Sequence, residues 1–154
     1  MNNRYLCKAK DKDDGRWYEG YYLLLHDTTY CCMPSDNAEE TKRFEEKNTH
    51  HYIVFEQMTD WGLPNRHLRA EILPETLCRC TGLKDKNGKL IWENDIVTGW
   101  FDEEHIVGYI RYGSNGCFYI ERNGLYGIHL DNSQDWLELC GNRFDNPELL
   151  EVEE

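Results

Sequence analysis

The chain has 154 residues, 40% apolar and 13% aromatic, which is enough to bury a core and indicates a globular rather than a disordered protein. Its 17 basic and 29 acidic side chains give a formal net charge of −12 with no Lys/Arg cluster, which disfavours binding to nucleic-acid phosphates. No window approaches about 18 continuous apolar residues and no apolar signal segment opens the chain, so we expect a cytoplasmic protein without a membrane span. Its seven cysteines are then expected to be free thiols.

The first part of the chain reads as an antiparallel meander. Alternating or β-rich patterns predict strands over residues 5–10, 16–25 and 28–33, and Gly20 inside the second of these is typical of a bulge or bend. Further strands are expected over residues 52–55 and 68–73. Between them, residues 35–47 predict a short exposed helix or a mobile loop, begun by the capping pair Asp36 and Glu39. Residues 1–74 are therefore expected to form one lobe with this insertion.

The stretch from Thr81 to Val97 contains the strongest turn signal of the chain, Asn87-Gly88. Two geometries are open: a two-residue type I′ hairpin, or a type I turn opened by Asp85 with Gly88 as the left-handed bulge residue. In either case the flanking segments return beside each other as paired strands. A second reversal follows at residues 93–95.

Short strands with glycine turns follow the central hairpin, over residues 96–100, 106–112, 117–122, 125–130 and 136–140. This pattern argues for a small barrel or a curled sheet. A terminal helical turn is expected with Asn146 as its N-cap and Pro147 as its first residue. Residues 75–154 are thus expected to form a second lobe, and the whole chain to be mainly β.

The segment Thr81–Lys89, followed by Ile91 and Asp95–Val97, resembles the hallmark of the YopX-like phage and prophage proteins. Three further segments are similar to that family in the same order: Gly15–Tyr21, Pro74–Thr76 and Gly141–Leu150. Two positions depart from the family pattern. Asn94 stands where Gly is usual and is the next best residue for positive φ, and Cys78-Arg79-Cys80 stands where Gly-Gln-Tyr is usual.

The resemblance implies a mainly β fold whose later lobe is similar to an SH3-like barrel, and it implies a phage or prophage origin. It brings no activity, no cofactor and no catalytic residues. The chain also lacks a phosphate-binding Walker loop, a dinucleotide-binding glycine motif, a nucleophile elbow and a zinc-protease helix motif.

Two weak candidates for a metal site remain. Cys78 and Cys80 share one face of a strand, and Asp102, Glu104 and His105 sit in a turn where they could bind a divalent ion or act as acid and base. Buried thiols and an ordinary solvated loop explain the same residues. For Asp95 we expect a structural role, with its carboxylate accepting backbone N–H groups.

Aromatic side chains offer a contact surface instead. Neighbours on a strand face opposite ways, so adjacent aromatic pairs such as Trp17/Tyr18 and Tyr21/Tyr22 cannot all be buried in a one-sided sheet. The candidate contact residues are Trp17, Tyr21, Trp92, Trp100 and Tyr119.

These observations favour a non-catalytic module that binds a host or phage protein or associates with itself, without a cofactor. A nucleic-acid-binding small barrel is the alternative, which the charge disfavours, and a metal-dependent hydrolase using residues 102–105 is the third hypothesis.

Overall fold

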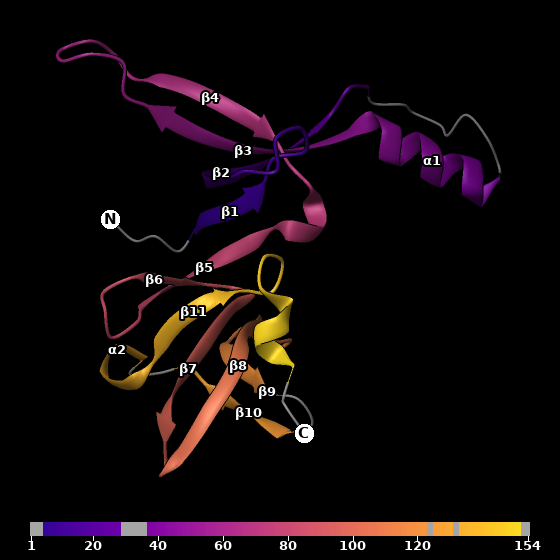
Figure 1. Cartoon of the computed structure of the whole chain (residues 1–154). Helices are drawn as coiled ribbons and strands as arrows, with labels where there is room; N and C mark the ends of the chain where they lie inside the picture. Colours follow the sequence, from indigo (N-terminus) through magenta and orange to yellow (C-terminus); the bar gives the residue numbers. More distant parts are fainter. Residues whose placement is uncertain (1–4, 29–36, 123–124, 131–132, 152–154) are drawn as a thin grey trace. The chain divides into compact units, whose positions relative to one another are not determined.

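The computed structural model describes residues 5–28, 37–122, 125–130 and 133–151. The fold is mainly β, as predicted, and the chain forms two compact units (Figure 1). The first spans Leu6–Leu77, and the second begins at Cys78 and also includes Tyr5. The expected strand over residues 28–33 lies almost wholly outside the described residues. None of the helices in the described part of the chain has both the length and the apolar content to cross a membrane.

The first unit is built on a four-stranded antiparallel meander. Its strands β1 (Leu6–Lys10), β2 (Trp17–His26), β3 (Thr49–Gln57) and β4 (Arg66–Glu71) pair in sequence order. The meander curls until its outer strands meet, because Asp11 bridges Ile72 and the Leu73 N–H donates to the Lys10 carbonyl at 2.9 Å. A short 3₁₀ turn, η2 (Pro74–Thr76), follows. The curled sheet encloses a small core of Ala9, Ile53 and Ile72.

Gly20 does not form the bulge that its position in a strand predicts. It pairs in regular register with Cys7, and a Cβ at this position would lie 2.1 Å from the Val54 carbonyl oxygen. Glycine is required here because β3 approaches the backbone of β2 too closely for any side chain. Close packing thus explains the residue, and the bend expected at Gly20 stays a prediction.

The insertion forms an exposed helix, α1 (Ala38–Asn48), which extends away from β2 and β3 in Figure 1. Its N-cap is Asn37, whose side chain accepts the Glu39 N–H at 3.0 Å, whereas the predicted cap Asp36 lies outside the described residues. No residue of α1 is buried, as expected from the absence of an apolar stripe.

The second unit contains seven strands: β5 (Cys78–Lys84), β6 (Leu90–Trp92), β7 (Asp95–Phe101), β8 (Glu104–Tyr112), β9 (Phe118–Arg122), β10 (Leu125–His129) and β11 (Glu138–Asn142). Strands β5 and β6 form the central hairpin, and the other five form an antiparallel sheet in the order β10-β9-β8-β7-β11. Its core includes Ile91, Val97, Ile110, Ile120 and Leu137. This arrangement is compatible with the SH3-like barrel, which stays a prediction.

Near the C-terminal end, one local expectation is wrong and another is confirmed. The last strand begins at Glu138 rather than Trp136, because residues Ser133–Trp136 form the short helix α2. The final 3₁₀ turn, η3 (Pro147–Leu150), has Asn146 as its N-cap residue and Pro147 at its start, as expected, although the Asn146 side chain makes no capping bond there. Instead, the Asn146 side chain turns back to accept from the Asn142 N–H at 3.5 Å.

Candidate interaction surface

The central hairpin adopts the second of the two predicted geometries. The Gly88 N–H donates to the Asp85 carbonyl at 2.9 Å, and Gly88 has φ +80°. Asn87 does not have positive φ, so this is a type I turn opened by Asp85 and closed by a left-handed glycine. The sequence Asp-Lys-Asn-Gly therefore specifies a tight reversal and presents no reactive group.

Asp85 is 1% exposed, and its carboxylate organises this turn. Oδ1 accepts the N–H groups of Asn87 and Lys89 at 2.9 and 2.8 Å, and Oδ2 accepts the Leu139 N–H at 3.1 Å. Burial alone would raise the pKa of Asp85, but these backbone donors favour the charged form and hold the pKa below its usual value. The charge is stabilised as an acceptor and is not available as a general base.

Asp95 has the structural role predicted for it. Its carboxylate accepts the Trp92 N–H at 2.8 Å and the Asn142 side-chain amide at 3.1 Å. The preceding Asn94 has φ +66°, which confirms that it takes the backbone conformation for which glycine is usual. The hallmark segment is thus bonded to the closing Gly141–Leu150 segment, and both are used to hold the second unit together.

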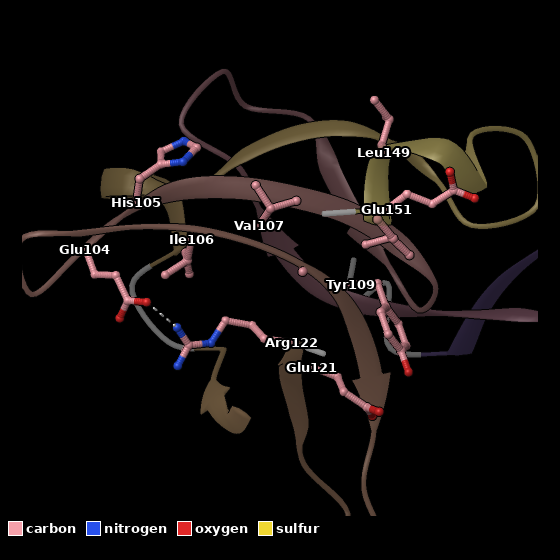
Figure 2. Close-up of a pocket in the computed structure, with 11 residues that line it drawn as sticks. Glu104, His105, Ile106, Val107, Tyr109, Glu121, Arg122, Leu149 and Glu151 are labelled. Atoms are coloured by element: carbon pink, nitrogen blue, oxygen red, sulfur yellow. Dashed lines mark hydrogen bonds and ion pairs between the residues drawn. The ribbon is translucent and has the colours of Figure 1, made fainter. Parts of the chain in front are cut away.

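The turn proposed as a metal or acid–base site is engaged in other interactions. Glu104 forms an ion pair with Arg122 at 3.1 Å, and both residues line a cavity of about 300 Å³ (Figure 2). Asp102 has φ +48° in the β7–β8 turn, while Cys78 and Cys80 are buried on β5. Within the described residues, no three His, Cys, Asp or Glu side chains are arranged to hold a metal ion.

His105 has a hydroxyl neighbour but is not placed to activate it. Its Nε2 lies 2.9 Å from the Thr98 hydroxyl oxygen, and that hydroxyl donates its one proton to the Ile106 carbonyl at 2.9 Å. Nε2 must therefore carry the proton and donate to Thr98. A histidine acting as a general base would have to accept from the hydroxyl instead, so this pair is arranged as a structural contact.

The five predicted contact aromatics lie in different environments. In the first unit, Tyr21 is 55% exposed, whereas Trp17 is half-buried beneath the ammonium groups of Lys8 and Lys10. In the second unit, the remaining three residues range from exposed to buried: Trp100 (67% exposed), Tyr119 (half-buried) and Trp92 (4% exposed). Trp92 is a core residue and cannot contribute to an exposed surface.

The most apolar exposed segment is the end of β2. Five consecutive side chains, Tyr21–Leu25, are all exposed, with Leu24 at 43%. Because side chains alternate along a strand, Tyr22 and Leu24 lie on one face of the sheet while Tyr21, Leu23 and Leu25 lie on the other. In the described structure, both faces of this part of the sheet therefore carry exposed apolar side chains.

This end of β2 also has an open side. Pairing with β1 stops at Tyr21, whereas pairing with β3 continues to His26. In the part of the chain that the structure describes, no strand pairs with Tyr22–His26 on the side opposite β3. We call this segment the β2 edge. Exposed apolar edges of this kind are templates for another strand, and proteins usually protect them with Lys or Pro, neither of which occurs here.

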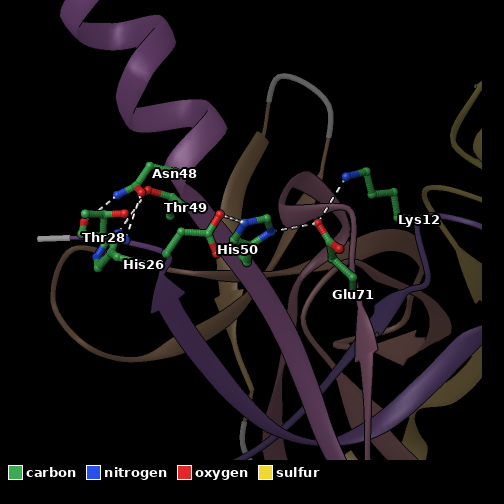
Figure 3. Close-up of polar contacts among 8 residues, drawn as sticks. Lys12, His26, Thr28, Asn48, Thr49, His50 and Glu71 are labelled. Carbon is green, nitrogen blue, oxygen red and sulfur yellow. Dashed lines mark hydrogen bonds and ion pairs between the residues drawn. The ribbon is translucent and has the colours of Figure 1, made fainter.

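A polar network anchors the far end of the β2 edge (Figure 3). His50 on β3 contacts Asp27 at 3.1 Å and Glu71 at 3.2 Å, and Glu71 contacts Lys12 at 3.0 Å. The two carboxylates, Asp27 first, raise the pKa of His50. These contacts fix the strand end in an extended geometry, which lowers the conformational cost of adding a strand to it.

The sequence analysis identified Tyr21 but missed the leucines beside it. The available signal was the run Tyr21–Leu25, which is apolar at every position and has none of the alternation of a half-buried strand. From the sequence alone, such a run is equally typical of a strand that is buried on both faces of a sheet. Only the pairing of β1, which ends at Tyr21, shows that nothing in the described chain covers it.

These features define a mainly β protein of two units whose most distinctive surface is an uncovered apolar strand. The family model described as YopX protein matches residues 8–151, which is nearly the whole chain. The chain therefore belongs to the YopX family. A comparison with curated proteins finds no match.

Proposed function

We propose that this YopX-family protein is a non-catalytic interaction module of phage or prophage origin, acting in the cytoplasm of a bacterial host. It binds another polypeptide as an added strand along the β2 edge. The observation that carries this proposal is the exposed apolar run Tyr21–Leu25 on a strand whose pairing with β1 has ended. Strand addition gives affinity through main-chain hydrogen bonds and specificity through alternate side chains.

The chemistry of the partner follows from the chemistry of the edge. Residues 21–25 carry no charge, in a chain where 30% of residues are charged. On β3, their partners Val54, Ile53 and Tyr52 are uncharged, and the remaining two, His51 and His50, lie beside Leu24 and Leu25. A charged strand would lose hydration along residues 21–23 without gaining an ion pair. The proposal therefore requires an extended, apolar and uncharged partner segment.

Strand addition can be tested with a synthetic probe. A fluorescent peptide that alternates Val and Thr between terminal lysines is titrated with the protein, and its anisotropy is followed. We expect saturable binding with a Kd on the order of 10–100 µM, since such a contact is smaller than a standard protein interface. A matched peptide with Pro at alternate positions cannot donate the ladder hydrogen bonds and should not bind.

The matched variants are Leu24→Lys, on the β2 edge, and Leu63→Lys, at another exposed leucine in the β3–β4 loop. Leu24→Lys should abolish peptide binding because it places a charge on the edge, whereas Leu63→Lys should bind like the wild type. Equal binding by both variants would disprove the role of the edge.

The alternative function, binding to nucleic acid, predicts a different effect of salt on affinity. Binding to phosphates weakens steeply as salt rises, because counterions are released. Strand addition of a short peptide at the uncharged part of the edge should depend far less on salt between about 0.05 and 0.5 M. Retardation of single-stranded DNA or RNA that is lost at the higher salt would favour the alternative.

A further inference from the structure

We propose that the strand that adds to the β2 edge is the same edge of a second copy, so that the protein forms a two-fold homodimer with β2 paired antiparallel to β2. This inference rests on the proposed function and names its partner. A two-fold interface brings one surface against itself, so the β2 edge must be complementary to its own sequence.

The β2 edge meets that condition. Antiparallel pairing centred on Leu24 places Leu24 opposite Leu24 of the other copy and Leu23 opposite Leu25. Tyr22 then lies opposite His26, and every residue of the edge has a partner. In each pair the two residues are zero, two or four positions apart in the sequence, so their side chains lie on the same face of the sheet. The two sheets can therefore continue into one another across the junction. A shift of the centre by one residue leaves one end of each edge without a partner.

The side-chain chemistry agrees with this pairing. Two Leu–Leu contacts form on one face, through Leu23 and Leu25, and the central Leu24 pair forms on the other. Tyr22 bonds its hydroxyl to His51 on β3 at 2.7 Å, so its polar end already has a partner within the same copy. No pair in the junction brings two like charges together, which is the usual obstacle to self-pairing.

The charges elsewhere on the protein oppose association and set its salt dependence. Each copy carries a net charge of −12, so two copies repel at long range in dilute buffer. Salt screens that repulsion, with a Debye length of about 30 Å at 0.01 M and about 10 Å at 0.1 M, while the apolar contact persists. Dimerisation should therefore strengthen as salt rises, the reverse of an association held by ion pairs.

The size of the contact indicates moderate affinity. A stable interface buries about 800 Å² on each partner, and five partly exposed side chains provide less than this. We expect a dimer that dissociates on dilution, with a Kd on the order of 10–100 µM at about 0.15 M salt.

Analytical ultracentrifugation of the full chain tests the proposal, over about 1–500 µM protein and at about 0.05 and 0.5 M NaCl. The wild type should shift from monomer to dimer with concentration, at lower concentrations in the higher salt. Leu24→Lys should remain monomeric throughout, and Leu63→Lys should follow the wild type. Far-ultraviolet circular dichroism of both variants checks that the fold is kept.

Cross-linking tests the register independently of any disruptive charge. In the proposed dimer the two Leu24 positions lie directly opposite each other, with Cβ atoms about 4.5–5.5 Å apart. A Leu24→Cys variant treated with a short bismaleimide should give a covalent dimer in far higher yield than Leu63→Cys. All seven native cysteines, of which Cys117 and Cys140 are exposed in the described part of the chain, are common to both variants and set the background.

The outcomes separate this inference from the proposed function. A wild-type protein that stays monomeric at every concentration, but binds the Val/Thr peptide, overturns the homodimer and leaves strand addition standing. A dimer that survives Leu24→Lys and shows no preference for Leu24→Cys also overturns it, because another surface must then hold the copies together. A monomer that binds no peptide overturns both.

Discussion

Replacing the buried Asp85 should destabilise the second unit more than replacing any exposed polar side chain of the hairpin. In Asp85→Ala the N–H groups of Asn87, Lys89 and Leu139 all lose their acceptor. Hydrogen bonds to a charged group are worth about 1.5–3 kcal/mol each, but the turn can open to water, so we expect a total loss of about 3 kcal/mol. Asp85→Asn keeps Oδ1 and presents an amide N–H₂ to the Leu139 N–H, which should cost about 2 kcal/mol.

The stability lost on replacing Asp85 should depend on pH. The pKa of Asp85 is lowered in the folded protein, so its charge stabilises the fold above the unfolded value of about 3.8. That stability is lost as the pH falls through the folded pKa, where the wild-type carboxyl also becomes neutral. The difference between wild type and Asp85→Asn should therefore be fully present at about pH 7 and should shrink below about pH 4.

Urea unfolding followed by tryptophan fluorescence measures the effect. With a slope of about 2 kcal/mol per molar urea, Asp85→Asn should lower the midpoint by about 1 M at neutral pH. Glu103→Gln, an exposed carboxylate in the β7–β8 turn, is the matched control and should leave the midpoint unchanged. An Asp85→Asn midpoint equal to that of the wild type at pH 7, or a gap that does not narrow in acid, would refute the reasoning.

Three further changes have expected outcomes. Gly20→Ala should cost about 3 kcal/mol by thermal unfolding, because its Cβ would meet the Val54 carbonyl at 2.1 Å, and a loss below about 1 kcal/mol would mean that β3 shifts freely. Asn94→Ala should be about 1 kcal/mol less stable than Asn94→Gly, since alanine is strained at φ +66°, and equal Tm values would contradict this. The pKa of His50 is raised, so its charge adds stability that is full below about pH 6.5 and is lost as the pH rises through the folded pKa. The Tm advantage over His50→Gln should therefore narrow between about pH 6 and pH 9, and a constant or widening gap would exclude the contact with Asp27.

Local signals predicted most of the strands because each depends on residues close in sequence. The turn at Asp85–Gly88 is the clearest case, since the geometry follows from Asn87, Gly88 and the Asp85 side chain. The backbone conformation of Asn94 can likewise be inferred from the sequence, because few residues other than glycine adopt a positive φ. These features require no knowledge of the rest of the fold.

The features that the sequence did not reveal depend on distant partners. The function of Gly20 follows from the approach of Val54, and the role of Asp85 depends partly on the Leu139 N–H. The candidate interaction surface is of the same kind. The residues Tyr21–Leu25 do not themselves indicate whether another strand pairs with them. That depends on β1, whose pairing with β2 extends only as far as Tyr21.

The bonds from Asp85 to Leu139 and from Asp95 to Asn142 also set an order of events during synthesis. The four strands of the first unit's meander all precede Leu77, so they can pair with one another while the rest of the chain is still being made. The hallmark segment cannot complete its hydrogen bonds this early. Its buried carboxylates, Asp85 and Asp95, also accept from donors about 50 residues later in the chain. A ribosome that stalls before Leu139 therefore leaves Asp85 without its Leu139 donor and Asp95 without its Asn142 donor in an incomplete sheet, while the β2 strand that carries the proposed edge has already been made.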